Sequence, residues 1–263
     1  MSISNACPDT AARAHVEGIR MVGPYHHYGI HEPVAVGDND NLPVAEQPAG
    51  DDWLTPEETA EIVGDINSVR WPYLFPADRG PFIRIYGGKR FYPFSPRASE
   101  VDIRAIAHSL ARLVRYTGHG GRFYSVSEHS VHIADWLLPR HGARVALAGL
   151  LHDSPEALSG FGDVARPSKQ RAPIIKETEQ AIWLAVAAAF CLSPVMPEAV
   201  HEADNRIITD EMRQNLDGYE HDAEPLGVTL EFWSPERAEA EFLDAYRMLV
   251  AAVEKGRRRR DLY

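Results

Sequence analysis

The stretch ARVALAGLLHDSPEALSG, residues 143–160, places a His-Asp pair and then a Glu between flanks that are typical of a buried helix. Its first half is apolar on nearly every side, which is typical of the central, most buried helix of a bundle. Burying an imidazole beside a carboxylate costs several kcal/mol unless each group is paired or bound to an ion. His152, Asp153 and Glu156 therefore indicate either a satisfied buried ion pair or a bound ligand.

Hydrophobic periodicity predicts further helices on both sides of this stretch. Residues 99–115 carry apolar side chains at nearly helical spacing. The next helix opens with a capping box formed by Ser125 and Glu128, and we expect it to stop at Pro139. Further helices are expected at about 173–191, 197–216 and 235–255.

A β-hairpin is expected before the helices, because residues 80–97 alternate apolar and polar side chains around Gly87 and Gly88. Most of residues 1–75 is rich in Gly, Pro, Asp and Asn and shows no sustained periodicity. The sequence therefore predicts an all-α helical bundle at 76–263, with a small β-hairpin before the helices and a partly irregular N-terminal extension at 1–75.

The composition restricts the partners. The chain has 263 residues, of which 44% are hydrophobic, and its net charge of −11 argues against a nucleic-acid-binding surface. A small anionic substrate would need a local cluster of positive charge or a metal ion. Because the chain has no apolar run of about 18 residues and no signal-peptide pattern, we expect a cytoplasmic protein (in the host-cell cytoplasm if a phage encodes it) with no membrane partner.

Histidine and carboxylate side chains recur where the helices of such a bundle would converge, and these groups bind borderline and hard divalent cations. His129 lies in the first turn of one helix and Asp204 lies on another. Adjacent residues of a helix point about 100° apart, so His152 and Asp153 can bind one ion only where the helix end frays or where the ion sits over the edge between them. Pro155 predicts a bend directly after the pair.

Three segments in this order carry a family resemblance: YSVSEHSVHIA, LLHDSPEALSGFGDVARPSK and VHEADNRIITDEM. They resemble the HD-domain metal-dependent phosphohydrolases, whose motifs follow the order His, His-Asp, Asp. Within that superfamily they look most like the bacterial 5'-deoxynucleotidases and their phage relatives, which include deoxynucleoside triphosphate triphosphohydrolases such as a dATP triphosphohydrolase. The resemblance covers roughly residues 80–220 and implies the HD-domain helical fold.

The resemblance also implies roles for individual residues. It implies one divalent metal ion (Co, Mn, Zn or Mg) bound by His129, His152, Asp153 and Asp204. Glu156 matches the carboxylate that positions or deprotonates the attacking water. Asp163 and Lys169 match the segment after the His-Asp helix, although Phe161 and Gly162 form a small insertion there. Arg115 matches an arginine that contacts substrate phosphate, and His119 is expected at the same pocket edge.

Two of these residues keep a second interpretation. Arg115 also suits the C-terminus of the predicted helix at 99–115, where cations are favoured. Asp204 and Glu211 are seven residues apart and therefore share one helix face. Glu211 is interpreted either as a surface charge or as a further carboxylate at the site.

The expected function is hydrolysis of a small-molecule deoxynucleotide, either a monophosphate to nucleoside or a triphosphate to nucleoside and triphosphate, by a metal-dependent enzyme that forms a homo-oligomer. A catalytically silent HD scaffold with a regulatory role is the non-enzymatic alternative. A (p)ppGpp-type hydrolase would carry HDxxED, whereas Ala157 follows Glu156 here. A di-iron oxygenase of the same fold would need histidines within 154–200, and that segment has none.

Overall fold

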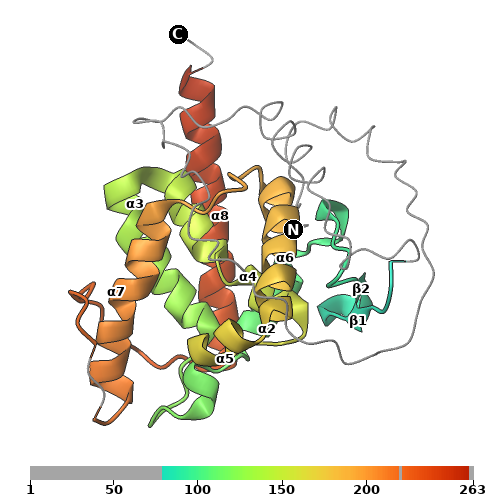
Figure 1. Cartoon of the computed structure of the whole chain (residues 1–263). Helices are drawn as coiled ribbons and strands as arrows, with labels where there is room; N and C mark the ends of the chain where they lie inside the picture. The colour runs from blue at the N-terminus through green and yellow to red at the C-terminus, as the bar shows by residue number, and fades with distance from the viewer. Residues whose placement is uncertain (1–78, 219–220, 261–263) are drawn as a thin grey trace, which may run out of the picture.

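The computed structural model describes residues 79–218 and 221–260, which are mostly helical (Figure 1). This confirms the all-α class, whereas the predicted extension at 1–75 lies outside the described residues. The helices are α2 (Ile103–Leu110), α3 (Val126–Leu151), α4 (Ser154–Ser159), α5 (Arg166–Arg171), α6 (Pro173–Phe190), α7 (Glu198–Asn215) and α8 (Pro235–Arg260). In the described ranges, no helix combines the length and the hydropathy that a membrane span requires.

The predicted hairpin is present and short. Strand β1 (Ile83–Arg84) pairs antiparallel with β2 (Arg90–Phe91), and a 3-10 turn, η2 (Tyr86–Gly88), joins them. Gly87 and Gly88 have φ values of 82° and 76°, a region that favours glycine. The hairpin is anchored by the fully buried ring of Phe91, which belongs to the main hydrophobic core.

Helix α3 doubles back on itself. His129 and His152 are 23 residues apart, which would separate them by about 34 Å along a straight helix. Their ring centroids lie only 5.3 Å apart. The reversal occurs at Gly142, whose φ of 79° and ψ of 173° interrupt the helical backbone. Residues 126–141 and 143–151 are therefore two helical arms that lie side by side.

The position of the reversal differs from the expected stop at Pro139. Pro139 lies inside α3, and the helical backbone continues past it to Gly142. Proline lacks an N–H but keeps a helical φ, so the chain can continue for a few residues, whereas a positive φ near extended ψ is accessible almost only to glycine. Gly149 then allows the arms to approach, because a Cβ there would lie 2.5 Å from Leu137 Cδ1 and 3.1 Å from Ile133 Cγ2.

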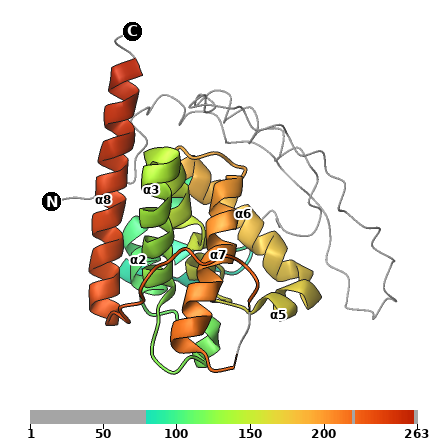
Figure 2. The ribbon, with the colours of Figure 1, turned by 90° about the vertical axis from the view of Figure 1, so that its left-hand side faces the viewer.

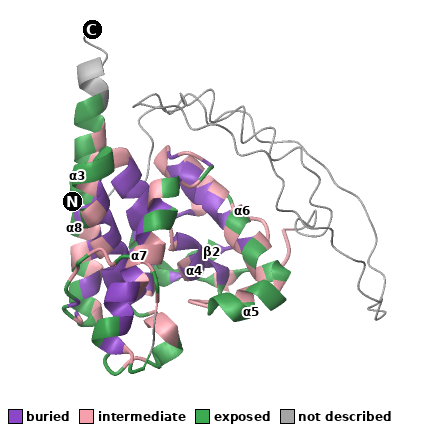
Figure 3. Ribbon diagram, turned by 60° about the vertical axis from the view of Figure 1, so that its left-hand side comes forward, coloured by how far each residue is buried: buried purple, intermediate pink, exposed green. Residues whose placement is uncertain are grey.

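Helices α7 and α8 pack against these two arms, whereas α2 and α6 pack against α4. Figure 3 shows the buried faces of the helices turned inward. The C-terminal turns of α8 project beyond the bundle (Figures 1 and 2). Helix α2 is shorter than the predicted helix at 99–115, because Val114 leaves the helix to form a β-bridge with Ser125. The short helix α5 was not predicted.

A buried carboxylate ties the start of α3 to the start of α8. Ser125 Oγ accepts a hydrogen bond from the Glu128 N–H at 3.1 Å, as a capping box requires. The Glu128 side chain does not complete the box. It is fully buried, and its two oxygens accept hydrogen bonds from the backbone N–H groups of residues 231–233 at 2.7–2.9 Å. The carboxylate thus satisfies donors that precede α8 by only a few residues.

The reversal at Gly142 predicts a difference between two glycine substitutions. We expect Gly142→Ala to lower the free energy of unfolding by about 1–3 kcal/mol, because alanine is strained at this backbone conformation. Gly256→Ala is the matched control, since Gly256 is exposed on α8 with open surroundings and alanine favours a helix there by up to about 1 kcal/mol. Urea denaturation measures both, and equal stabilities would contradict the role of Gly142.

The hydrogen bonds between Glu128 and residues 231–233 predict a difference between a second pair of substitutions. We expect Glu128→Gln to lower the free energy of unfolding by about 2–3 kcal/mol, because the amide nitrogen would face a buried backbone N–H and leave it unsatisfied. Glu236→Gln should change the same quantity by less than about 0.5 kcal/mol, since Glu236 is exposed and lies 3.8 Å from Arg112. A Glu128→Gln protein as stable as this control would show that the tie contributes little.

Candidate metal centre

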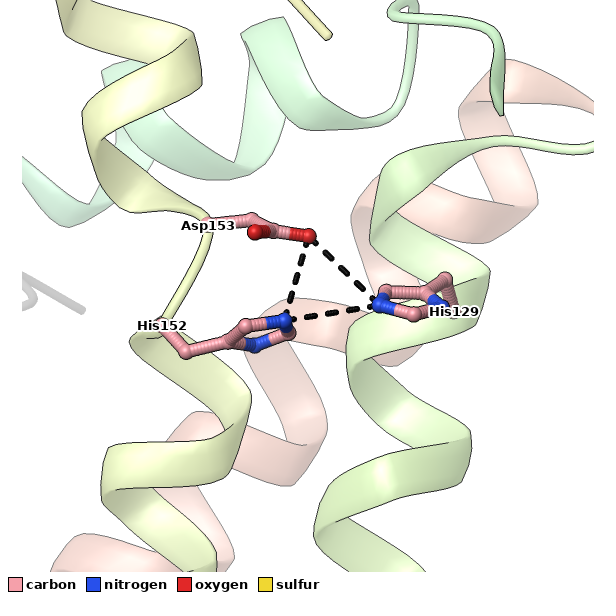
Figure 4. Close-up of side chains that lie close together, drawn as sticks. All are labelled: His129, His152 and Asp153. Carbon is pink, nitrogen blue, oxygen red and sulfur yellow. Dashed lines mark hydrogen bonds and ion pairs between the residues drawn. The ribbon is translucent and has the colours of Figure 1, made fainter. Parts of the chain in front are cut away.

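The two arms of α3 and the helix that follows bring three predicted ligands together. His129 lies in the first turn of α3, and His152 is the C-terminal cap of the same helix. Asp153 is the N-terminal cap of α4, whose second residue is Pro155. The helix therefore breaks at the His-Asp pair itself and not just after it, because Ser154 already belongs to α4. This break turns both side chains toward His129 (Figure 4).

The ligand atoms form a compact group. His129 Nε2 lies 3.4 Å from His152 Nε2 and 3.5 Å from Asp153 Oδ2, and His152 Nε2 lies 3.2 Å from Asp153 Oδ2. Asp204, on α7, places Oδ1 3.4 Å from His129 Nε2 and 3.9 Å from His152 Nε2. Ligands about 2.1 Å from one tetrahedral ion would be separated by about 3.4 Å. The His129, His152 and Asp153 cluster could therefore hold a metal ion.

Neighbouring groups orient both imidazoles. His129 Nδ1 lies 2.6 Å from Glu211 Oε1, and His152 Nδ1 lies 2.7 Å from the Gly149 carbonyl oxygen. Both partners only accept hydrogen bonds, so each Nδ1 carries the proton and each Nε2 of the neutral ring presents a lone pair. Asp153 Oδ2 is buried and accepts no hydrogen bond from the described residues. Such a group of acceptors is satisfied by a cation placed between them.

The pKa shifts of His129 and Asp204 also favour a positive charge between these side chains. Burial and Arg115 lower the pKa of His129, but Glu211 and Asp204 outweigh them and raise it to about 9. Burial raises the pKa of Asp204, yet its hydrogen bond with His129 and the charge of His152 leave that pKa well below its ordinary value. Positive charge is thus favoured between these groups, whether a proton or a metal ion carries it.

Glu156 lies beside this cluster with one oxygen available. Lys169 Nζ donates to Glu156 Oε1 at 2.9 Å and also lies 2.9 Å from Glu179 Oε1. Glu156 Oε2 is buried and accepts no hydrogen bond from the described part of the chain. Burial, followed by the charges of Asp153 and Asp163, raises the pKa of Glu156 well above its ordinary value although Lys169 opposes this shift. Glu156 and Lys169, which the sequence predicted as separate site residues, are in direct contact.

Arg115 lies within the site and is largely buried. Its Nη2 donates to Glu211 Oε2 at 3.1 Å, and its Nη1 lies 3.9 Å from Asp163 Oδ2. Although burial lowers its pKa, these two carboxylates raise the pKa of Arg115 well above its ordinary value. The residue is outside α2 and begins the 3-10 helix η4 (Arg115–Gly118), so it does not cap the C-terminus of α2.

Glu211 is a site residue that the sequence left open. It is fully buried on α7 and contacts His129, Arg115 and the hydroxyl of Tyr116, which donates to its Oε2. Burial raises its pKa, but the charges of Arg115 and His129 outweigh this and hold the pKa of Glu211 at about 2. The sequence signals for this position were the seven-residue spacing from Asp204 and the resemblance, since relatives often carry a carboxylate there.

His119 is not brought into the cluster. It is exposed and caps η4, and its backbone N–H donates to the Tyr116 carbonyl oxygen at 3.0 Å. Its expected place at the pocket edge stays a prediction. Arg166 was not predicted as a site residue, and its Nη2 lies 3.5 Å from Asp204 Oδ2. Arg166 begins α5, the helix that the periodicity did not reveal.

Two known proteins are similar to this chain, whereas no known family profile matches it. "Uncharacterized protein YfdR" of Escherichia coli (strain K12) is 33% identical over 132 residues, which cover 50% of this chain and 71% of YfdR. "Uncharacterized protein RCAP_rcc00048" of Rhodobacter capsulatus is 35% identical over 128 residues, which cover 46% of this chain and 63% of that protein, less than two thirds of its length. By its identity and its coverage of the first relative, the chain belongs to the same family as YfdR.

Proposed function

We propose that the chain is an HD-domain phosphohydrolase that uses one divalent metal ion to hydrolyse deoxynucleotides. The observation that carries the proposal is the convergence of the His129, His152 and Asp153 ligand atoms beside the unsatisfied Oε2 of Glu156. When bound, a divalent ion would polarise a phosphoryl oxygen and lower the pKa of a coordinated water. Asp204 would complete the ligand set, because its Oδ1 faces both imidazoles.

The residues around the cluster suit hydrolysis at phosphorus. Glu156 can accept the proton of an attacking water at Oε2, because Lys169 engages only Oε1. Its pKa, raised by burial and by neighbouring carboxylates, makes the deprotonated form a stronger base. Arg115 can contact a phosphate with little loss of conformational entropy, because Glu211 and Asp163 already hold its guanidinium.

The charge balance favours a substrate with one phosphate over a triphosphate. Among the described residues around the cluster, carboxylates outnumber cations: Asp153, Glu156, Asp163, Glu179, Asp204 and Glu211 against Arg115, Lys169 and Arg166. Arg115 and Lys169 each pair with two of these carboxylates. One divalent ion would leave little positive charge for a polyphosphate. We therefore propose a deoxynucleoside monophosphate as the substrate.

The alternatives have less support from these residues. A catalytically silent scaffold is expected to lack a ligand or the carboxylate that activates water, whereas His129, His152, Asp153, Asp204 and Glu156 are all present. A (p)ppGpp-type hydrolase is disfavoured by Ala157, which takes the place of the second acidic residue of HDxxED. The chain's own residues thus favour the nucleotidase.

Metal binding is the first prediction of this proposal. After dialysis against a chelator, the full chain should bind one Mn²⁺, Co²⁺, Zn²⁺ or Mg²⁺ ion per molecule in calorimetric titrations. His152→Ala and Asp153→Asn should abolish this binding, because each removes a ligand. His201→Ala should leave it unchanged, since His201 is exposed on α7, the helix that carries Asp204. Binding of none of the four ions by the wild-type protein would refute the proposal.

Turnover is the second prediction. The metal-loaded protein should release nucleoside and phosphate from deoxynucleoside monophosphates, as resolved by chromatography, and be far less active on triphosphates. Glu156→Gln should lower kcat by about 10²–10⁴-fold without loss of metal, because the amide cannot accept the water proton. Glu198→Gln, an exposed change on α7, should leave kcat unchanged. Release of triphosphate would overturn the substrate assignment, and no turnover of any nucleotide would overturn the enzyme.

A further inference from the structure

Glu211 is the side-chain partner of His129, one of the candidate metal ligands, and contacts its Nδ1. His152 Nδ1 is held by a backbone carbonyl, that of Gly149, which is neutral and cannot be altered by substitution. His129 Nδ1 is held instead by the Glu211 carboxylate at 2.6 Å. The two imidazoles therefore receive the same tautomer from partners of different charge. Of these two Nδ1 partners, only the Glu211 carboxylate carries a charge, and this charge makes the His129 imidazole more basic.

The Glu211 carboxylate is itself fixed on its other side. Its Oε2 accepts hydrogen bonds from Arg115 Nη2 at 3.1 Å and from the Tyr116 hydroxyl, so both of its oxygens are used. Tyr116 has a φ of 57°, a conformation that is uncommon for a residue with a side chain. The backbone there delivers two consecutive side chains, Arg115 and Tyr116, to one buried carboxylate. That arrangement fixes Glu211 without using the oxygen that faces His129.

We propose that Glu211 is a positioning residue: it sets the His129 tautomer so that Nε2 binds the metal ion, and it holds Arg115 where substrate phosphate binds. This inference rests on the proposed function. A single carboxylate thereby joins the metal ligand and the phosphate contact, which lie on two different segments of the chain. Loss of the Glu211 charge should weaken binding of the metal ion, because the hydrogen bond to His129 persists while its imidazole becomes less basic.

The test is the affinity of Glu211→Gln for Mn²⁺ and Co²⁺, measured by calorimetric titration of the full chain. We expect the Kd to rise about 10–100-fold relative to wild type. The matched control is Asp210→Asn, since Asp210 is the preceding residue on α7 and accepts hydrogen bonds from Leu226 and Gly227 N–H groups, away from the cluster. The control should be destabilised in thermal unfolding but keep the wild-type Kd. Equal Kd values for Glu211→Gln and wild type would overturn the inference.

A measurement on the wild-type protein keeps the test independent of how the variant folds. In the Zn²⁺-loaded protein, ¹⁵N-edited NMR of the imidazoles should show His129 protonated at Nδ1 and ligated through Nε2. A proton on Nε2, or ligation through Nδ1, would overturn the inference. Failure of the wild-type protein to bind any of these ions would instead refute the proposed function, so the two failures are distinguishable.

Discussion

The reversal of the chain at Gly142 is the constraint on which the rest of the structure depends. It converts one apolar helical segment into two arms, and it places the first turn of α3 beside its last residue. Gly149 sustains this arrangement by allowing the second arm to approach Leu137 and Ile133. Without the reversal, His129 and His152 would stand at opposite ends of a long helix. The geometry of the candidate metal centre is thus set by a backbone conformation that few residues other than glycine adopt.

The buried carboxylates show how the same residue type performs two kinds of task. Glu128 is fully satisfied, because its two oxygens accept hydrogen bonds from backbone N–H groups of residues 231–233. Asp153 Oδ2 and Glu156 Oε2 are buried without a donor among the described residues. A buried carboxylate whose oxygens accept hydrogen bonds stabilises the fold, whereas a buried oxygen without a donor calls for an explanation, and a cation held at the candidate metal centre is one. Both oxygens of Glu211 have hydrogen-bond partners, and one of them holds His129 Nδ1, so that His129 Nε2 faces Asp153.

The sequence predicted much of the fold, because periodicity and capping residues are local signals. The helices near 173–191, 197–216 and 235–255 are present within a few residues at most boundaries, although α8 continues to Arg260. The stop at Pro139 was wrong, because proline is a strong helix-ending signal in sequence while the decisive feature is the φ of Gly142. The side-chain task of Glu128 depends on residues more than a hundred positions away, so no local pattern could reveal it.

The candidate site was predictable where a motif marked it. His152, Asp153 and Glu156 stood out because their flanks are apolar, and His129 and Asp204 stood out as histidine and carboxylate on other predicted helices. The resemblance then implied their roles. Glu211 was left open, because its partners, Arg115 and Tyr116, come from a turn of unusual backbone conformation.

The most direct test of the account is anomalous diffraction from crystals of the wild-type protein grown with Mn²⁺. The account predicts one strong peak bound by the Nε2 atoms of His129 and His152 and by Asp153 and Asp204, with Glu156 adjacent. The absence of a peak there, with the protein otherwise folded as described, would contradict it.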